Sequence, residues 1–525
     1  MHVFNTIVGL RTSLQEYTKK LGDGVNIGLV PTMGCLHAGH LSLIKQARQD
    51  NQIVVVSIFV NPLQFLPQED LAEYPRQIES DRLICQETGV DILFTPSPEA
   101  LGISHKPTAG EINSHMIIHP PANMTNIMCG KSRPGHFQGV TTIVTKLFNI
   151  VQPTRAYFGQ KDSQQLAIIQ KLVNDLNIPV EIIPCPTVRE SSGLAFSSRN
   201  QYLNEREKEQ AAVLYRALQQ GEKTFHQRLQ HTDDIDIDQT TAIKNVVEIE
   251  LAKVPNIAIE YVELVDPDTL QPLSYIEKSG LLAIAARIGN TRLIDNIILR
   301  NRRPIITIDG PAGAGKSTVT KLVAKELGLL YLDTGAMYRA VTWLVLNQKI
   351  PLDDQSAIAE LVDQCHIQFT GPEKNQVVIN GQDVTQAIRS LEVTSNVSNI
   401  ASQATVRYFM VRQQRELGAI GGLVGEGRDL GTHIFPDAEL KIFLTATVQE
   451  RARRRFLELQ AQGETQITQA QLEVDITERD HLDSSRTISP LRKAEDAQEI
   501  YTDNLSIPEV VNTIVNLYQK TVKAI

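Results

Sequence analysis

The chain has 525 residues, of which 42% are hydrophobic and 21% are charged, so it is long enough for about three globular domains with their own cores. Its formal net charge of −9 argues against a protein that binds nucleic acid through the phosphate backbone, and its five scattered cysteines lack the pairing of a disulfide framework or a zinc site. The N-terminus has no basic segment followed by a long apolar one, and no apolar run reaches membrane-spanning length. We therefore expect a soluble, cytoplasmic protein with reduced thiols and no membrane or nucleic-acid partner.

Strands and helices alternate through the first part of the chain. Apolar runs predict strands at residues 25–33, 53–60, 90–95 and 155–159, and helical periodicity predicts helices at residues 40–50 and 140–151. This rhythm is typical of a doubly wound parallel sheet. In such sheets ligands bind at the carboxyl ends of the strands.

The first strand-to-helix loop, PTMGCLHAGH at residues 31–40, has the composition of a phosphate site. His37 and His40 are three residues apart, so both imidazoles can face one bound group, and Gly34 and Gly39 let the backbone approach it closely. Two histidines beside a phosphate can donate hydrogen bonds to charge that develops during attack. A pair of half-buried histidines that cap a helix is the alternative for this motif taken alone.

Polar residues follow other strand ends. Asn61 and Gln64 carry amides suited to the hydroxyls and carboxylate of a small polar substrate. Lys161 can neutralise phosphate oxygens, and Asp162 can hold a ribose hydroxyl or a metal-bound water. Residues 197–199 offer two hydroxyls and a guanidinium, which suit a triphosphate. Each group alone also fits a solvated surface, but together they supply the parts of an adenylation site.

The loop resembles the HxGH signature of the nucleotidyltransferase superfamily, and over essentially residues 1–300 the chain is similar to the pantothenate synthetase (pantoate–β-alanine ligase) family. The further motifs that carry this resemblance are FVNPLQF at residues 59–65, YPR at 74–76, RPGHFQGVTTIVTKLFN at 133–149, FGQKDSQQL at 158–166, GLAFSSRNQYL at 193–203 and TRLIDN at 291–296. It implies an α/β fold, with a Rossmann-like nucleotidyltransferase domain at residues 1–190 and a small α+β C-terminal subdomain at residues 191–300.

The resemblance also implies a reaction in two steps. The carboxylate of (R)-pantoate attacks the α-phosphorus of Mg-ATP to give pantoyl adenylate and diphosphate, and the amine of β-alanine then displaces AMP to form pantothenate. His40 would be the proton donor, with His37 beside it, and Lys161 and Arg199 would complete the catalytic set. The implied ATP-binding residues are Met33, Gly34, Cys35, Leu36, His37, Ala38, Gly39, His40, Gly159, Gln160, Lys161, Asp162, Val188, Phe196, Ser197, Ser198 and Arg199. The implied pantoate and β-alanine residues are Asn61, Gln64 and Gln165.

A second nucleotide motif follows a short, charged junction at residues 299–304. The apolar residues 305–308 precede GPAGAGKST at residues 310–318, which fits the phosphate-binding loop pattern G-x-x-x-x-G-K-[ST] in full. A glycine-rich turn with a surface lysine is the alternative. Because the synthetase pattern ends only a few residues earlier, we expect the loop to open a second enzyme domain.

The remaining chain carries charged groups after predicted strands. An arginine and a hydroxyl occur at residues 333–339, and an arginine next to a carboxylate occurs at residues 425–429. Four arginines at residues 451–455 fit a phosphate clamp or a plain surface better than a nucleic-acid site in so acidic a chain.

From residue 304 to about residue 520 the chain resembles the cytidylate kinase family, through IDGPAGAGKST, LDTGAMYR, GRDLGTHIFPDAELKIFL and ERDHLDSSRTISPL. The resemblance implies a P-loop nucleoside monophosphate kinase fold at residues 301–525, with transfer of the ATP γ-phosphate to CMP or dCMP. The implied ATP-binding residues are Gly310, Pro311, Ala312, Gly313, Ala314, Gly315, Lys316, Ser317 and Thr318, with Lys316 catalytic and Ser317 at the magnesium ion. The implied CMP-binding residues are Thr334, Arg339, Ser402, Arg407, Arg428, Asp429, Asp483 and Arg486, with Arg479 in a lid.

The sequence thus predicts a bifunctional enzyme that uses Mg²⁺ with ATP as substrate and has no tightly bound organic cofactor. Its partners would be ATP, pantoate, β-alanine and CMP or dCMP, and the chain would form a homodimer or higher homo-oligomer. One alternative is a nucleotide-binding module without turnover, which the presence of all the charged groups disfavours. Another is an RNA-directed adenylating enzyme, which the acidic net charge disfavours.

Overall fold

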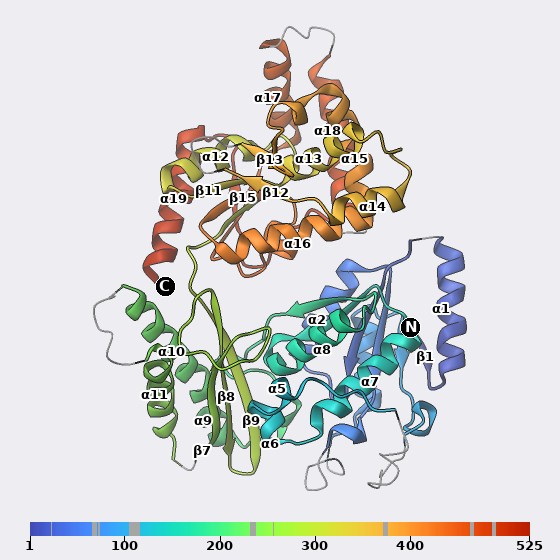
Figure 1. Cartoon of the computed structure of the whole chain (residues 1–525), viewed down its shortest axis with the longest axis vertical. Coiled ribbons are helices and arrows are strands. Elements are labelled where there is room, and N and C mark those ends of the chain that lie inside the picture. The colour runs from blue at the N-terminus through green and yellow to red at the C-terminus, as the bar shows by residue number, and fades with distance from the viewer. Residues whose placement is uncertain are drawn as a thin grey trace. The chain divides into compact units, whose positions relative to one another are not determined.

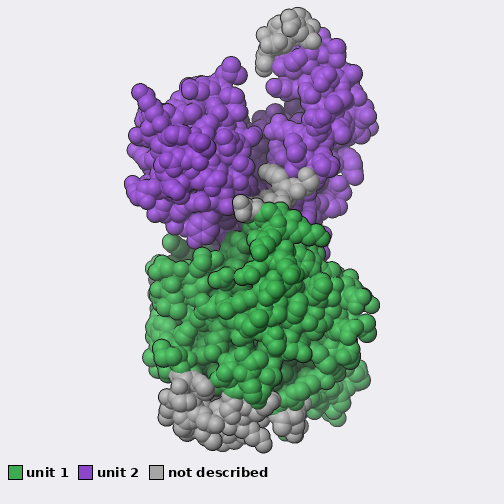
Figure 2. All heavy atoms as spheres, turned by 90° about the vertical axis from the view of Figure 1, so that its right-hand side faces the viewer, with its two compact units in different colours: residues 1–301 green, residues 302–525 purple. Residues whose placement is uncertain are grey.

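The computed structural model of the chain describes residues 1–22, 24–65, 71, 74–103, 116–230, 238–255, 257–370, 376–461, 467–485 and 490–524. Two compact units make up the chain, Met1–Asn301 and Arg302–Ile525, and Figure 2 colours them green and purple. The predicted boundary at residue 190 inside the first unit stays a prediction. Among the described residues, no helix combines the length and the apolar character needed to span a bilayer.

A six-stranded parallel sheet forms the larger part of the first unit. Its strands are β1 (His2–Phe4), β2 (Ile27–Thr32), β3 (Ile53–Ile58), β4 (Ile92–Phe94), β5 (Arg155–Gly159) and β6 (Glu181–Cys185), in the order β1-β4-β3-β2-β5-β6. The main helices are α1 (Ile7–Leu21), α2 (Ala38–Asp50), α3 (Ile78–Glu87), α7 (His136–Val151) and α8 (Ser163–Asp175), and the shorter ones are α5 (Ala122–Thr125) and α6 (Met128–Ser132) (Figure 1). The predicted parallel α/β architecture is confirmed, and β1 and β6 are strands that the sequence analysis did not predict.

Burial on both faces explains why the strands are so apolar. In β3, Val54 and Val56 pack in a cluster with α2, whereas Ile53 and Val55 pack in a second cluster with residues of α1, α7 and α8. Successive side chains of a strand point to opposite faces, so a sheet covered by helices on both sides needs an unbroken apolar run. The carboxyl ends of β2, β3 and β5 remain open to loops, and these loops carry the predicted site residues.

A three-stranded antiparallel sheet forms the smaller part of the first unit. Its strands are β7 (Ile257–Val265), β8 (Ser279–Ile288) and β9 (Thr291–Arg300), and its helices are α9 (Glu205–Ala211), α10 (Val213–Gln230) and α11 (Gln239–Ala252). Phe225 and Val247 from the helices pack with Leu282 and Ile284 of β8. This arrangement confirms the small α+β part, and it shows that the TRLIDN motif lies in β9.

The second unit is built on a five-stranded parallel sheet of order β11-β15-β10-β16-β17. Its strands are β10 (Ile306–Asp309), β11 (Leu330–Asp333), β15 (Leu423–Gly427), β16 (Leu440–Thr445) and β17 (Gln498–Tyr501). One cluster packs α12 (Lys316–Leu327) and α19 (Ile507–Ala524) against the sheet, and another packs α13 (Thr334–Asn347) and α16 (Ala404–Ile420). The other helices are α14 (Gln355–Asp363), α15 (Leu391–Ser402), α17 (Val448–Ala461) and α18 (Gln469–Ser485). A small antiparallel sheet of β12 (Ile367–Phe369), β13 (Val377–Ile379) and β14 (Gln382–Asp383) was not predicted.

Candidate active sites

A cavity of about 230 Å³ lies at the carboxyl ends of β2, β3 and β5 in the first unit. It gathers most of the predicted synthetase residues: Met33, His37, Gly39, His40, Asn61, Gln64, Gly159, Lys161, Asp162, Gln165, Val188, Phe196, Ser197, Ser198 and Arg199. Its wall does not include Gly34, Cys35, Leu36, Ala38 and Gln160, which lie in the same segments. Tyr74, which the sequence indicated only as part of the YPR motif, also lines the cavity, and its hydroxyl is 3.3 Å from that of Ser198.

The two histidines form the first turn of α2. His37 is the N-cap, and its Nδ1 accepts a hydrogen bond from the Gly39 amide at 3.2 Å, while its own amide donates to Nδ1 of His40 at 3.4 Å. Their rings lie 4.0 Å apart. Burial, followed by the positive charge of Lys161, lowers the pKa of His37 to about 4. Burial, followed by the electrostatic effect of His37, lowers the pKa of His40 to about 3. Both rings are therefore neutral at pH 7, and His40 carries its hydrogen on Nε2, because its Nδ1 accepts the hydrogen bond from the His37 amide.

A buried carboxylate that the sequence did not reveal holds the histidine loop. Asp81 of α3 accepts hydrogen bonds from the amides of Cys35 at 2.8 Å and Leu36 at 2.7 Å. Cys35 has a φ of 53°, a left-handed conformation that a non-glycine residue adopts only when its surroundings hold it there. Because Asp81 lies 46 residues from Cys35, no local spacing connects the two.

We expect Asp81→Asn to raise the KM for ATP in pantoate-dependent AMP release about tenfold, because the amide can accept from only one of the two loop N–H groups and leaves the other buried without an acceptor. Glu79→Gln, an exposed change on the same helix, is the matched control and should leave the KM unchanged. Equal KM values for the two variants would show that the carboxylate does not hold the loop.

The amide of Gln64 is held by groups from two segments. Gln64 belongs to a short 3₁₀ turn, η1 (Pro62–Gln64), and its Nε2 lies 2.6 Å from the Met33 sulfur, while Asn61 Nδ2 donates to Gln64 Oε1 at 3.1 Å. His136, from the RPGHF motif, lies with its Nδ1 2.8 Å from the Gln64 carbonyl oxygen. A Cβ at Gly139 would lie only 2.3 Å from the Leu63 carbonyl oxygen, so α7 can pack against this turn only with glycine there.

Gly139→Ala is therefore expected to displace the turn that carries Gln64 and to lower kcat/KM for pantoate about 100-fold, the effect typical of a shift of about 1 Å at a substrate-positioning group. The CMP kinase rate of the same chain should not change. Asn149→Ala, on the exposed side of α7, is the control. A Gly139→Ala variant with normal kcat/KM for pantoate would contradict the packing argument.

A larger cavity of about 530 Å³ continues from the first one toward the smaller part of the unit. The two share Lys161, Asp162, Gln165, Ser197 and Arg199. Its further walls come from α6 and from strands β8 and β9. The phosphate-binding candidates thus lie between the two parts of the unit.

In the second unit, the phosphate-binding loop runs from β10 to α12 as predicted. At Gly310, where φ is 148°, a Cβ would lie 2.0 Å from the Leu444 carbonyl oxygen, so the loop can begin only with glycine. Lys316 is the first residue of α12, and its Nζ donates to the Pro311 carbonyl at 2.7 Å. Burial, with the positive charge of Arg428, lowers the pKa of Lys316 to about 8.

Two carboxylates that the sequence did not reveal support this loop. The Ser317 hydroxyl donates to Oε2 of Glu426 at 2.7 Å, and burial raises the pKa of that carboxyl group. Asp309, at the end of β10, accepts from the amides of Leu430 at 3.0 Å and Gly431 at 2.7 Å, and burial raises its pKa to about 7. Asp309 therefore connects the ATP loop with the segment that carries Arg428 and Asp429. Among the described residues, no cluster of three histidine, cysteine or acidic side chains is arranged to hold a metal.

Three predicted CMP-site arginines are each paired with a carboxylate. Arg339 donates to Asp333 at 2.9 Å, Arg407 donates to Asp429 at 3.0 Å, and Arg428 pairs with Asp483 of α18. Of the other predicted residues, Thr334 donates to the Glu426 carbonyl at 2.8 Å and Ser402 donates to the Asn399 carbonyl at 2.8 Å, at the end of α15. Arg479 lies on α18, and Arg486 lies outside the described residues.

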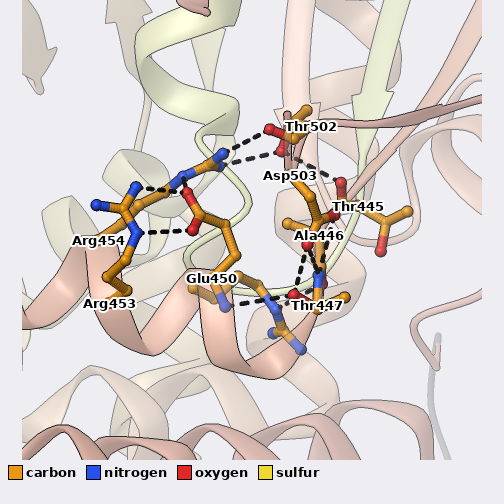
Figure 3. Close-up of polar contacts among 9 residues, drawn as sticks. Thr445, Ala446, Thr447, Glu450, Arg453, Arg454, Thr502 and Asp503 are labelled. Atoms are coloured by element: carbon orange, nitrogen blue, oxygen red, sulfur yellow. Dashed lines mark hydrogen bonds and ion pairs between the residues drawn. The ribbon is translucent and has the colours of Figure 1, made fainter. Parts of the chain in front are cut away.

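The arginines of helix α17 form ion pairs and hydrogen bonds with other groups of the second unit. Figure 3 shows Glu450 between Arg453 and Arg454, both 2.8 Å away, and these arginines lower the pKa of Glu450 to about 2. Arg454 also donates to the Thr502 carbonyl at 2.6 Å. Arg451 pairs with Asp480 and donates to the Ala312 carbonyl at 3.0 Å. The helix thus contacts the phosphate-binding loop and Thr502, the residue that follows β17, and its four arginines are all paired.

Comparison with known proteins gives one family for each unit. The family model described as pantoate-beta-alanine ligase matches residues 2–298, and the model described as cytidylate kinase matches residues 306–520. A protein of Trichodesmium erythraeum (strain IMS101) named bifunctional pantoate ligase/cytidylate kinase is 59% identical, over 99% of this chain and 98% of its own length. A protein of the same name from Trichormus variabilis is 60% identical, over 94% of this chain and 91% of its own length. The crystal structure of pantothenate synthetase from Thermus thermophilus shares 41% identity with a TM-score of 0.50, over 57% of this chain and 99% of that chain.

Proposed function

The chain belongs to the family of bifunctional pantoate ligase/cytidylate kinases, and from that premise we propose which of its residues carry each reaction. It is a pantoate–β-alanine ligase in its first unit and a cytidylate kinase in its second. The two reactions share ATP as a substrate but use different devices to hold it. A histidine loop serves the ligase, and a glycine-rich loop serves the kinase.

In the ligase, the amides of Gln64 and Gln165 bind pantoate and place its carboxylate against the α-phosphorus of ATP. His40 donates a hydrogen bond from Nε2 to the phosphate oxygens on which negative charge builds, and His37 supports it. Lys161 and Arg199 bind the departing diphosphate. The acyl adenylate supplies the leaving group that a carboxylate lacks, so the β-alanine amine can displace AMP.

In the kinase, Lys316 stabilises the transferred γ-phosphate, and an oxygen of the CMP phosphate attacks in line. Arg339, Arg407 and Arg428 neutralise the CMP phosphate, and Asp429 binds the cytosine edge. Each arginine exchanges its present carboxylate partner for the phosphate when CMP binds. No protein group has to act as a nucleophile.

Magnesium enters the kinase with ATP, and the residues present fit it. The Ser317 hydroxyl and the Glu426 carboxylate are hard oxygen ligands 2.7 Å apart, which suits a small divalent cation. Mg²⁺ bound there would neutralise charge on the β- and γ-phosphates. We extend the proposal to a cytoplasmic enzyme that forms a homodimer or higher homo-oligomer and takes dCMP as well as CMP.

The observation that carries the ligase assignment is the convergence of His40, Lys161, Arg199 and Gln64 from four separate segments on one cavity. Two assays on the purified chain with Mg-ATP test the whole proposal. The first measures AMP release and should require both pantoate and β-alanine. The second measures ADP release and should require CMP. Background rates in either assay would overturn the assignment for that unit.

A further inference from the structure

Strand β9 of the smaller part reaches into the ATP site of the larger part. Its residues Asp295 and Asn296 are 3% and 7% exposed, so both polar side chains need partners within the protein. Asp295 and Asn296 have partners in two different segments that carry predicted ATP-binding residues. In the sequence this stretch stands out only as part of the TRLIDN motif, and neither reaction described above uses it.

Asn296 holds the turn that carries Lys161. Its Nδ2 donates to the Gln160 carbonyl at 3.0 Å and to the Lys161 carbonyl at 2.8 Å. These carbonyls belong to η3 (Gln160–Asp162), the short 3₁₀ turn between β5 and α8. A single turn has few backbone hydrogen bonds of its own, so the amide group fixes where the turn lies and where the Lys161 side chain starts.

Asp295 holds the other ATP-binding segment. Its two oxygens accept hydrogen bonds from Arg189 Nη1 at 2.6 Å and Nη2 at 2.9 Å, and Arg189 also donates to the Gly193 carbonyl at 3.1 Å. The Phe196 amide donates to the Val188 carbonyl, which closes a hairpin from residue 188 to residue 196. That hairpin leads directly into residues 197–199, the proposed triphosphate clamp.

Lys161 lies close enough to the histidines to influence them electrostatically, so a shift of its turn would change the charge in the cavity. It lines both cavities, and after burial its positive charge is among the causes that lower the pKa values of His37 and His40. A cation that has to meet phosphate oxygens loses much of its effect when its backbone moves, because an error of about 1 Å at a positioned group can cost 100-fold in rate.

We propose that Asn296 is a positioning residue for the adenylation step, acting through its hydrogen bonds to the Gln160 and Lys161 carbonyls. The proposal rests on the proposed role of Lys161 at the ATP phosphates. Lys161 touches the departing diphosphate, which has left before β-alanine attacks. Asn296 should therefore matter for formation of pantoyl adenylate and not for its aminolysis.

The test separates the two half-reactions in the full chain. Adenylation is measured as pantoate-dependent exchange of labelled diphosphate into ATP, and aminolysis as pantothenate formation from synthetic pantoyl adenylate and β-alanine. For Asn296→Ala and Asn296→Asp we expect exchange to fall about 10- to 100-fold and aminolysis to stay within about twofold of wild type. Asn174→Ala is the matched control and should leave both half-reactions unchanged, because Asn174 is an exposed asparagine on α8 that lines neither cavity.

A general structural role would lower both half-reactions together, and that result would overturn the proposal. So would wild-type exchange in Asn296→Asp, which keeps the shape of the side chain but lacks the N–H donors. A double-mutant cycle distinguishes this role from a general folding defect. If Asn296 acts through Lys161, Asn296→Ala should reduce exchange no further in a Lys161→Ala background. Additive losses would show that Asn296 does not act through Lys161. If instead the wild-type chain showed no pantoate-dependent exchange, the proposed function itself would fail.

Discussion

Lys316→Met is expected to lower the kcat of CMP phosphorylation about 1,000-fold and to leave pantothenate formation unchanged. Methionine preserves much of the length and apolar bulk of lysine. It removes the positive charge of Lys316, which is the one charged residue of the phosphate-binding loop at residues 310–318. A positive group at a phosphoryl-transfer transition state contributes about 10³-fold or more to kcat. The measurement is single-turnover ADP formation with CMP in excess.

The control for this prediction is Lys321→Met, an exposed lysine on the same helix α12, which should behave as wild type. Loss of both activities in Lys316→Met would mean that the two units do not work independently. A kcat within tenfold of wild type would remove Lys316 from the catalytic set.

His40→Ala is expected to lower kcat for pantothenate formation about 100- to 1,000-fold, the range found when one hydrogen-bond donor to a developing oxyanion is removed. The neutral ring donates from Nε2, because its Nδ1 accepts the His37 amide. Its low pKa of about 3 means that the donor is present throughout the neutral range, so the loss should not vary between about pH 6 and pH 8.

His119→Ala, an exposed histidine of the same unit, is the control for the removal of an imidazole. The kinase rate of His40→Ala should equal that of wild type. A His40→Ala variant with a raised KM for ATP and an unchanged kcat would show that the ring binds the nucleotide equally in the ground and transition states.

Sequence predicted well those features that depend on local pattern. Strands β3 and β10 consist mainly of β-branched residues and are buried on both faces, and such runs can be found without a structure. The two nucleotide loops were found for a related reason, since His37 caps α2 through Gly39 and Lys316 opens α12 directly after Gly315, so both motifs are local in the sequence. The close approach of the Leu444 carbonyl to Gly310 comes from a distant segment and was not predicted. The roles assigned to these residues stay predictions until the variants are measured.

Sequence did not reveal the groups that hold those loops in place. Asp81 and Asp309 each accept two backbone hydrogen bonds from segments 45 or more residues away along the chain. The choice of such a partner depends on tertiary packing, and a lone buried aspartate has no spacing that distinguishes it from a helix cap. The strands of the β12–β14 sheet were missed because two or three residues are too few to show an alternating pattern.

Under the proposed role of the histidine loop in ATP binding, Asp81 would also affect how tightly ATP binds. Fixing the backbone of one residue costs about 1–2 kcal/mol of conformational entropy. Because the carboxylate orders Cys35 and Leu36 when the chain folds, that entropy is lost before any nucleotide arrives, and ATP does not lose it a second time on binding. In the proposed ATP site, the buried side chain of Asp81 would therefore fix the loop before ATP binds, and the conformational entropy of fixing it would be lost during folding.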